Sequence, residues 1–226
     1  MKLFIYCAGG FGKEIMDLAE RINLFEKKWD TISFIDDIRL ESQTYGKFLF
    51  NFEQVLSENS LDSFEVSISN GEPYVRKMLY EKLKANNIAV ATLIDKSAIV
   101  SRTATLDEGV IIPAYCFVSS SAEIKHNVAL DTGTLVGHDT TIFENCSISS
   151  AVNIAGNCTI YANTYIGMGS QVKQGVTIGS GTIIGMGSVV YNNIPDGVIA
   201  LGNPARTVKA NSDKRVFGKS NSNPNN

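Results

Sequence analysis

The most constraining feature of the chain is an aliphatic residue at every sixth position over its second half. Ile, Leu or Val opens each hexad from Ile94 to Val190 without a miss. Four residues after each opener stands a small or β-branched residue, as at Cys116, Thr140 and Ser170. A period of six belongs neither to an α-helix nor to an isolated strand. It indicates a coil in which a short strand and a turn alternate.

Three such hexads would close one triangular coil, so that residues eighteen apart stack on one another. The aliphatic side chains would fill the interior, at roughly 1.5–3 kcal/mol each, and the small residues would fit near the corners. Cys116, Cys146 and Cys158 hold the small position and are expected to be packed there. Glycines recur at fixed offsets and are expected to supply positive φ in the turns: Gly133, Gly137, Gly169, Gly175, Gly179, Gly181, Gly185 and Gly187.

The first part of the chain has a different pattern, in which apolar runs and amphipathic runs alternate. Residues 2–7, 31–37 and 64–69 read as strands, and residues 88–94 as a strand that leads into the coil. Helices are expected after the glycine turn of residues 8–22 and within residues 70–87. This order predicts a small parallel sheet. The expected domains are a Rossmann-like α/β domain (1–92), the coil (93–210) and a disordered polar tail (211–226).

A glycine-rich turn follows the first strand, at Gly9, Gly10 and Gly12. It is not a full G-x-G-x-x-G, so the turn could serve packing alone, or its amides and the following helix N-terminus could hold a phosphate. Asp36 and Asp37 end the second strand, where a carboxylate can accept hydrogen bonds from a ribose or base. Together these features favour the binding of a nucleotide portion, not necessarily NAD.

Composition narrows the class of partner. The chain of 226 residues has a net charge of −3 and is 44% hydrophobic, which gives no general attraction to nucleic acid. No apolar run is long enough for a membrane span, and the N-terminus does not read as a signal peptide. A cytoplasmic location is the default expectation.

The hexads resemble those of the hexapeptide-repeat acyltransferases. Together with the first domain, the chain resembles the sugar acetyltransferases that include sialic acid O-acetyltransferases and UDP-bacillosamine and dTDP-amino-sugar N-acetyltransferases. The resemblance implies a left-handed parallel β-helix, a handedness that the spacing itself does not give. It also implies a homotrimer, with acetyl-CoA as co-substrate in the groove between neighbours, and a nucleotide-linked amino sugar as acceptor. Surface glycan synthesis, such as that of lipopolysaccharide O-antigen, would be the setting.

The chain contains only two histidines, both at the third position of a hexad and so near a corner of the coil. His126, in the polar run "EIKHN", is expected to be idle. His138 lies in "GHD", which resembles the family's active-site segment, with the histidine as general base and Asp139 orienting it. Stacking places Gly156 next to His138, and the resemblance implies that the N–H of Gly156 faces the thioester carbonyl. A metal-dependent carbonic anhydrase of this fold would need three histidines, so no metal is expected.

Further positions are carried over from the resemblance. Gly9, Gly10, Asp36 and Asp37, with Gly71 in a second glycine loop, would hold the nucleotide of the acceptor. Phe11 stands where relatives acting on bacillosamine carry a histidine, and Asp131 stands where relatives often have asparagine near the incoming amine. Ser147, Met168 and Met186 match positions that line the CoA groove. An O-acetyltransferase acting on a sugar hydroxyl or on sialic acid, and a non-catalytic hexapeptide scaffold, are the alternatives to N-acetylation.

Overall fold

Short aliphatic runs and amphipathic helices build the N-terminal domain of the computed structural model, which describes residues 1–217. Its sheet has the order β3-β4-β2-β1-β5, with β3 antiparallel at the edge and the other strands parallel. The strands are β1 (Lys2–Tyr6), β2 (Thr31–Ile35), β3 (Gln43–Thr44), β4 (Lys47–Phe50) and β5 (Phe64–Ile68). The helices are α1 (Gly10–Glu26), α2 (Phe52–Glu58) and α3 (Pro73–Ala85), with a 3-10 turn η1 (Leu61–Ser63).

The three predicted inner strands and both predicted helices are present. The β3–β4 hairpin and α2 were not predicted, because they lie in a stretch without a clear period. The expected strand over residues 88–94 is wrong for most of its length. Val90 makes one isolated bridge to Val66, and regular pairing resumes only at Leu93.

The hexads form the coil, with one two-residue strand for each hexad and the aliphatic opener as its second residue. These strands are β6 (Leu93–Ile94), β7 (Ile99–Val100), β8 (Thr105–Leu106), β9 (Ile111–Ile112), β10 (Phe117–Val118), β11 (Glu123–Ile124), β12 (Ala129–Leu130), β13 (Leu135–Val136), β14 (Thr141–Ile142), β15 (Ser147–Ile148), β16 (Asn153–Ile154), β17 (Thr159–Ile160), β18 (Tyr165–Ile166), β19 (Gln171–Val172), β20 (Thr177–Ile178), β21 (Ile183–Ile184) and β22 (Val189–Val190). An antiparallel pair, β23 (Val198–Gly202) and β24 (Ala205–Ala210), ends it.

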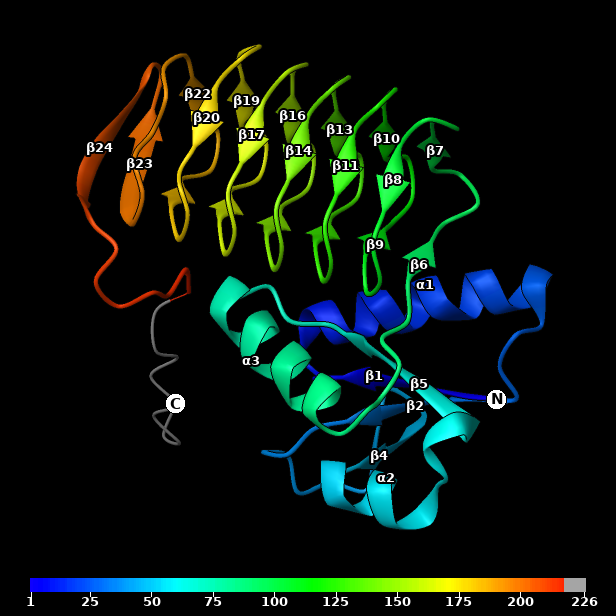
Figure 1. Cartoon of the computed structure of the whole chain (residues 1–226). Coiled ribbons are helices and arrows are strands. Elements are labelled where there is room, and N and C mark those ends of the chain that lie inside the picture. Colours follow the sequence, from blue (N-terminus) through cyan, green and yellow to red (C-terminus); the bar gives the residue numbers. More distant parts are fainter. Residues whose placement is uncertain (218–226) are drawn as a thin grey trace.

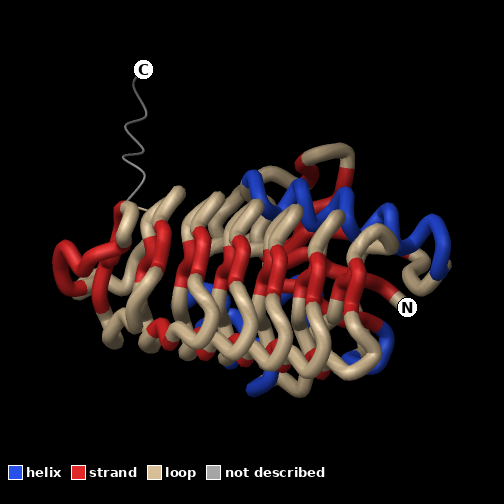
Figure 2. Tube along the Cα trace, turned by 90° about the horizontal axis from the view of Figure 1, so that it is seen from above, coloured by secondary structure: helices blue, strands red, loops and turns tan. Residues whose placement is uncertain are grey.

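Every third strand pairs in parallel, so residues eighteen apart stack as predicted; Val118, Val136 and Ile154 form one such column. The fold is a left-handed parallel β-helix with three flat sides, and Figure 2 shows its rungs stacked from above. We call side 1 the sheet of β6, β9, β12, β15, β18 and β21, side 2 that of β7, β10, β13, β16, β19 and β22, and side 3 that of β8, β11, β14, β17 and β20. Corner 1/2 includes residues 131–133, 149–151, 167–169 and 185–187, corner 2/3 residues 137–139 and 155–157, and corner 3/1 residues 125–127 and 143–145.

The interior of the coil is filled by the openers, most of which are completely buried. Several residues at the small position also form hydrogen bonds. Its hydroxyl or thiol group donates to a carbonyl fifteen residues later, as from Thr140 to Ala155 at 2.9 Å and from Cys146 to Tyr161 at 3.1 Å. The small-position cysteines are thus buried weak donors, and burial raises the pKa of Cys146 to about 12.

The turns need a left-handed residue at the third position after each opener, and the chain supplies it regularly from Gly109 to Gly187. Five of the predicted glycines hold this position. Asparagine and aspartate tolerate it best after glycine, and the other turns have Gly109, four asparagines, Asp139, Tyr115, Ser121 or Ala151 there. Gly137, Gly179 and Gly185 do not have positive φ. These positions have no room for a side chain because the next rung approaches closely. A Cβ built on Gly137 would lie 2.5 Å from the backbone N of Gly156.

The N-terminal domain packs on side 1 of the coil, where α1 runs along the underside (Figure 1). Ile15 and Leu18 of α1 share one buried cluster with Leu93, Ile111 and Ala129 of side 1. A buried arginine also joins the two parts. The guanidinium of Arg76 donates to the backbone oxygen of Asn127 at 2.8 and 2.9 Å and to the carbonyl of Ile68 at 2.7 Å. These contacts fix α3 and the end of β5 relative to the coil.

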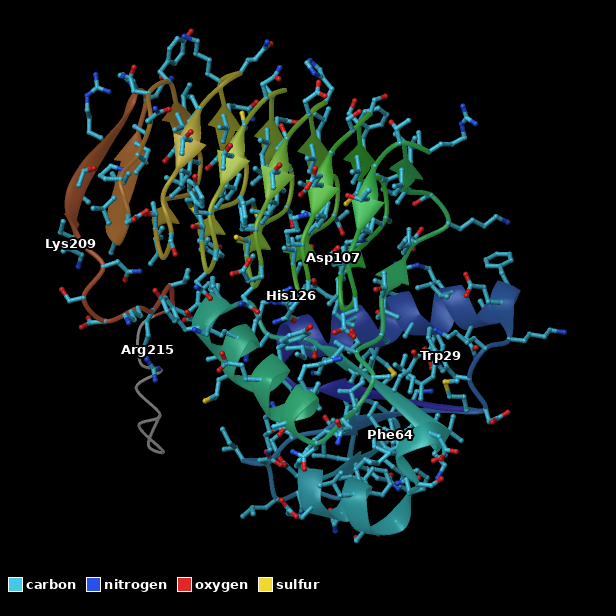
Figure 3. The ribbon with its side chains drawn as sticks, in the orientation of Figure 1. Trp29, Phe64, Asp107, His126, Lys209 and Arg215 are labelled. Atoms are coloured by element: carbon cyan, nitrogen blue, oxygen red, sulfur yellow. The ribbon has the colours of Figure 1, made fainter. Side chains whose placement is uncertain are left out.

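The tail differs from the expectation of disorder over residues 211–217. Asn211 is buried and its side-chain amide donates to the carbonyl of Gly181 at 2.8 Å. The chain then descends towards the start of α3, where Arg215 is labelled in Figure 3. The backbone N–H groups of Val216 and Phe217 donate to the carboxylate of Glu72. The rest of the predicted tail, 218–226, lies outside the described residues.

Candidate active site

His138 and Asp139 lie side by side in a turn of corner 2/3. The Nδ1 atom of His138 and an Oδ2 atom of Asp139 are 2.7 Å apart, and both side chains are about half exposed, at 52% and 54%. Asp139 takes the left-handed position of the turn, with φ of 56°, which directs its carboxylate back to the preceding residue. A carboxylate on Nδ1 leaves Nε2 of the neutral ring as the acceptor.

Gly156 occupies the same corner one rung further along. A Cβ atom built on Gly156 would lie 2.5 Å from Nε2 of His138, so the imidazole is packed against the glycine backbone. The N–H of Gly156 makes no hydrogen bond within residues 1–217. The stacking of Gly156 on His138 therefore places a free N–H donor beside the free ring nitrogen.

The glycine turn leads directly into α1, with Gly9 as the N-cap and Gly10 as the first helical residue. Nothing lies within 4 Å of a Cβ built on either glycine, whereas one on Gly12 would meet the carbonyl oxygen of Cys7 at 2.1 Å. Gly12 is thus required by packing, and the space over Gly9 and Gly10 is open. An open helix N-terminus is a physical basis for anion binding.

The two aspartates after β2 are engaged by the chain itself. The carboxylate of Asp36 accepts from the N–H groups of Ala8 and Ile38, both at 3.0 Å, and so braces the glycine turn. Asp37 accepts from Lys82 and from the N–H of Phe52, both at 2.8 Å, and from the hydroxyl of Tyr6.

The pKa of Asp37 reflects these contacts. Burial raises the pKa, but the hydrogen bonds from Lys82, Tyr6 and Phe52 outweigh burial and hold it below the usual value. A ribose would have to compete with these donors for the carboxylate.

A pocket of about 320 Å³ lies between α1, the C-terminal segment and side 1 of the coil. It brings together four residues singled out in the sequence, namely Phe11, Gly71, Asp131 and Ser147. Glu14, Tyr165 and Phe217 also line it. Sequence reasoning missed these three, because they come from a helix, a rung and the tail, and only the tertiary structure joins them.

Met168 and Met186 stack eighteen residues apart on corner 1/2 and are exposed, as the groove interpretation requires. They do not line the pocket. A separate groove of about 450 Å³ runs over side 2, where Leu135, Ala155, Lys173 and Tyr191 are among its lining residues. His138 and the pocket therefore lie at different corners of one chain, with side 2 between them.

Two further features lie away from these residues. His126, labelled in Figure 3, has a packing role, because its ring stacks on Tyr80 of α3 with centroids 4.7 Å apart. A hollow of about 840 Å³ lies at the other end of the N-terminal sheet, beside Lys2 and Thr31, and contains none of the predicted site residues. Within residues 1–217 no cluster of three or more His, Cys, Asp or Glu side chains could hold a metal ion.

Comparison with known proteins gives two family matches. Residues 2–83 match the family described as the PglD N-terminal domain, and residues 157–192 match the bacterial transferase hexapeptide family (six repeats). These are the two kinds of structure that the sequence predicted for the two parts of the chain.

Similar solved structures combine both parts. One is a histidine mutant of perosamine N-acetyltransferase from Caulobacter crescentus in complex with CoA and GDP-perosamine, at 25% identity and TM-score 0.83, covering 92% of this chain and 97% of that one. Another is the acetyltransferase domain of PglB from Neisseria gonorrhoeae in complex with acetyl coenzyme A, at 29% identity and TM-score 0.86, covering 92% of this chain and 98% of that one. A third is WeeI from Acinetobacter baumannii, at 27% identity and TM-score 0.86, covering 92% of this chain and 100% of that one.

The fold, the paired domains and these matches define an acyltransferase of the hexapeptide-repeat class. More narrowly, the chain is similar to sugar acetyltransferases such as these, which agrees with the resemblance found in its sequence. Among the described residues, no helix is both long and apolar enough to cross a bilayer.

Proposed function

We propose that the protein transfers an acetyl group from acetyl-CoA to the amino group of a nucleotide-linked sugar, with His138 as general base. The observation that carries this proposal is the arrangement at corner 2/3. Asp139 holds one ring nitrogen of His138, and the free N–H of Gly156 lies beside the other. An acyl transfer needs a base and an oxyanion donor in this relation.

In this mechanism the nitrogen of the acceptor amine attacks the carbonyl carbon of the thioester, and Nε2 of His138 accepts a proton from that amine. The N–H of Gly156 donates to the oxyanion that develops on the carbonyl oxygen. When the carbon–sulphur bond breaks, His138 returns the proton to the sulphur, and CoA leaves as the thiol. A positioned base of this kind contributes typically 10²–10⁴ in rate.

We propose that the working enzyme is a homotrimer, because the three sides of the coil differ. Side 1 is covered by α1, and the outward residues of side 3 are polar, such as Thr105, Glu123 and Thr141. The outward residues of side 2 begin with a column of exposed Ile99, Phe117 and Leu135. Such a column favours burial against another copy. A neighbour on side 2 would bring the His138 corner of one chain towards corner 1/2 of the next.

This arrangement would place acetyl-CoA in the groove between copies, along Ser147, Met168 and Met186. The acceptor is inferred from the N-terminal domain. Its open helix N-terminus at Gly9 and Gly10 suits a diphosphate, and a similar structure contains GDP-perosamine. Since acetyl-CoA and nucleotide sugars are cytoplasmic metabolites, we place the reaction in the cytoplasm, and surface glycan synthesis as its use.

The experiment is release of CoA thiol from acetyl-CoA in the presence of UDP-, dTDP- and GDP-linked 4-amino sugars, with sialic acid as the hydroxyl acceptor. We expect turnover with at least one amino sugar, and a His138→Ala variant at least a hundredfold slower with the same native mass. Acetylation of sialic acid alone would select the O-acetyltransferase alternative. No thiol release with any acceptor would support a non-catalytic scaffold.

A further inference from the structure

The C-terminal strap, residues 211–217, leaves the coil after β24 and crosses to the start of α3 (Figure 1). Its first residue is fixed on the coil. Asn211 is buried, its N–H donates to the carbonyl of Gly197 at 2.7 Å, and its side-chain amide donates to the carbonyl of Gly181. The strap is therefore anchored at its start, and its course beyond this point depends on other contacts.

The far end of the strap is held by few contacts, most of them at the surface. The Nζ atom of Lys214 lies 5.2 Å from the centre of the Tyr74 ring. The carboxylate of Glu72 accepts from the N–H groups of Val216 and Phe217 at 2.8 and 2.7 Å. Cation–π contacts at exposed sites are weak, and segments with few buried apolar contacts open most readily. The far end of the strap can thus detach while its anchor stays in place.

Phe217 forms a wall of the pocket between α1 and side 1 without filling it. Its ring packs 3.3 Å from the place of a Cβ on Gly71 and meets Tyr165 edge to face, with centroids 5.8 Å apart. The pocket has a volume of about 320 Å³ with the strap in this position, and 54% of Phe217 is exposed. A segment that blocked the site would occupy this space. The strap therefore has the geometry of a lid rather than that of a plug.

A buried hydroxyl group in the same pocket independently indicates a ligand. Ser147 lines the pocket and is only 5% exposed, yet its Oγ atom has no hydrogen-bond partner among the described residues. Buried polar groups in native structures nearly always have a partner. A polar group of a ligand would supply the partner that the chain itself does not.

The walls of the pocket indicate the chemical class of that ligand. Phe11, Tyr165 and Phe217 are aromatic, whereas Ser147 offers a hydroxyl group. A pyranose ring combines an apolar C–H face with polar hydroxyl edges and so matches such a pocket. Phe11 also adjoins Gly10, where the open helix N-terminus suits a diphosphate. With the diphosphate there, the sugar is the part of the acceptor that reaches Phe217.

We propose that the C-terminal strap is a lid that closes over the sugar of the acceptor, with the ring of Phe217 against the apolar face of the sugar and Glu72 as the latch. The proposal rests on the proposed function and adds the strap to its site. Phe217 becomes a substrate-binding residue, and Glu72 a positioning residue that acts through the strap. Closure of such a lid keeps water from the bound sugar. A nucleoside diphosphate without the sugar should not close it.

The first test measures how far ligands protect the strap from trypsin. Lys214 and Arg215 are exposed on the strap, and Arg215 is labelled in Figure 3; mass spectrometry of the remaining chain identifies cleavage after either residue. The full chain is digested alone, with UDP-, dTDP- and GDP-linked 4-amino sugars, and with UDP, dTDP and GDP. Since proteolysis follows the population of the open form, a nucleotide sugar that binds should slow this cleavage about fivefold or more, and its nucleoside diphosphate less than about twofold. Cleavage after Lys27, an exposed residue at the other end of α1, is the internal control and should not change.

The second test removes the ring or weakens the latch. Phe217→Ala should weaken binding of the nucleotide sugar about tenfold in titration calorimetry and leave the dissociation constant of the nucleoside diphosphate unchanged. Phe217→Tyr keeps the ring and should restore most of the affinity. The matched control is Phe25→Ala, which removes an exposed ring at the far end of α1, outside the pocket, and should change neither constant. Glu72→Gln should speed tryptic cleavage of the strap in the free chain by about threefold or more.

Equal protection by a nucleotide sugar and by its nucleoside diphosphate would overturn the lid, as would an unchanged affinity for the nucleotide sugar in Phe217→Ala or failure of every nucleotide sugar to bind. Thiol release recorded on the same samples separates this proposal from the proposed function. Turnover without protection of the strap refutes only the lid. Protection that depends on Phe217, without turnover of any acceptor, refutes only the transferase assignment.

Discussion

Replacing Gly156 by alanine tests the link between the coil geometry and the chemistry. The added Cβ would lie 2.5 Å from Nε2, 2.6 Å from Cε1 and 2.8 Å from Cδ2 of His138. Non-bonded heavy atoms prefer about 3.5–4.0 Å, so the imidazole must move by roughly 1 Å. The His138 side chain is half exposed, and it can rotate away into solvent at little cost in folding free energy.

We therefore expect Gly156→Ala to lower kcat/KM by roughly a hundredfold, or about 2.7 kcal/mol, the loss typical of a 1 Å misplacement at a reacting centre. The melting temperature should change by no more than about 2 °C. The assay is thiol release with an acceptor that the panel shows to be turned over, together with circular dichroism. A matched control is Gln174→Ala, which puts the same side chain on the next rung of the same corner, away from the imidazole. Near-normal activity in Gly156→Ala would refute the placement of His138 against this glycine.

Three other predictions follow from polar contacts elsewhere in the structure. Arg76→Met should lower the free energy of unfolding by about 3 kcal/mol or more in urea titrations, because the carbonyls of Asn127 and Ile68 lose their donors; a loss below about 1 kcal/mol would contradict this. Asp95 accepts from Arg21 and Ser97; burial raises its pKa, but these contacts outweigh burial and lower it. Its contribution is therefore present above the unfolded pKa near 3.9 and lost as pH falls through the lower folded pKa. Asp95→Asn should cost about 1–2 kcal/mol at pH 7 and much less at a pH below the folded pKa. An equal cost at both pH values would refute the ion-pair account. Glu72→Gln should loosen residues 216–217, which a spin label at the tail would report as faster motion; an unchanged spectrum would mean that Glu72 does not hold them.

The coil was predictable because each rung needs the same types of residue at the same positions. An interior aliphatic such as Val136 and a small neighbour such as Thr140 recur every six residues, so register and stacking follow from local pattern alone. The β3–β4 hairpin and α2 carry no such period, and the packing of residues 211–217 depends on contacts with Glu72 and Gly181, far away in the sequence.

The candidate site was also predictable only in part. His138, Asp139 and Gly156 could be predicted because the spacing of the hexads determines which residues stack. Only some residues of the pocket could be predicted, since they come from several segments. Asp131 and Ser147 were identified by position in the hexads, but Glu14 reads as one more polar residue of an amphipathic helix, and Phe217 as part of a polar tail. Nothing local relates either residue to the coil.

The central claim is that His138 of one chain acts on the pocket of a neighbouring chain, and a mixing experiment tests it most directly. His138→Ala and the pocket-filling variant Ser147→Phe are each inactive on this account. When they are co-expressed with different tags and the mixed trimers are purified, each mixed trimer has one intact site out of its three, or about a third of normal activity. Activity no greater than that of the two parents would contradict a site shared between chains.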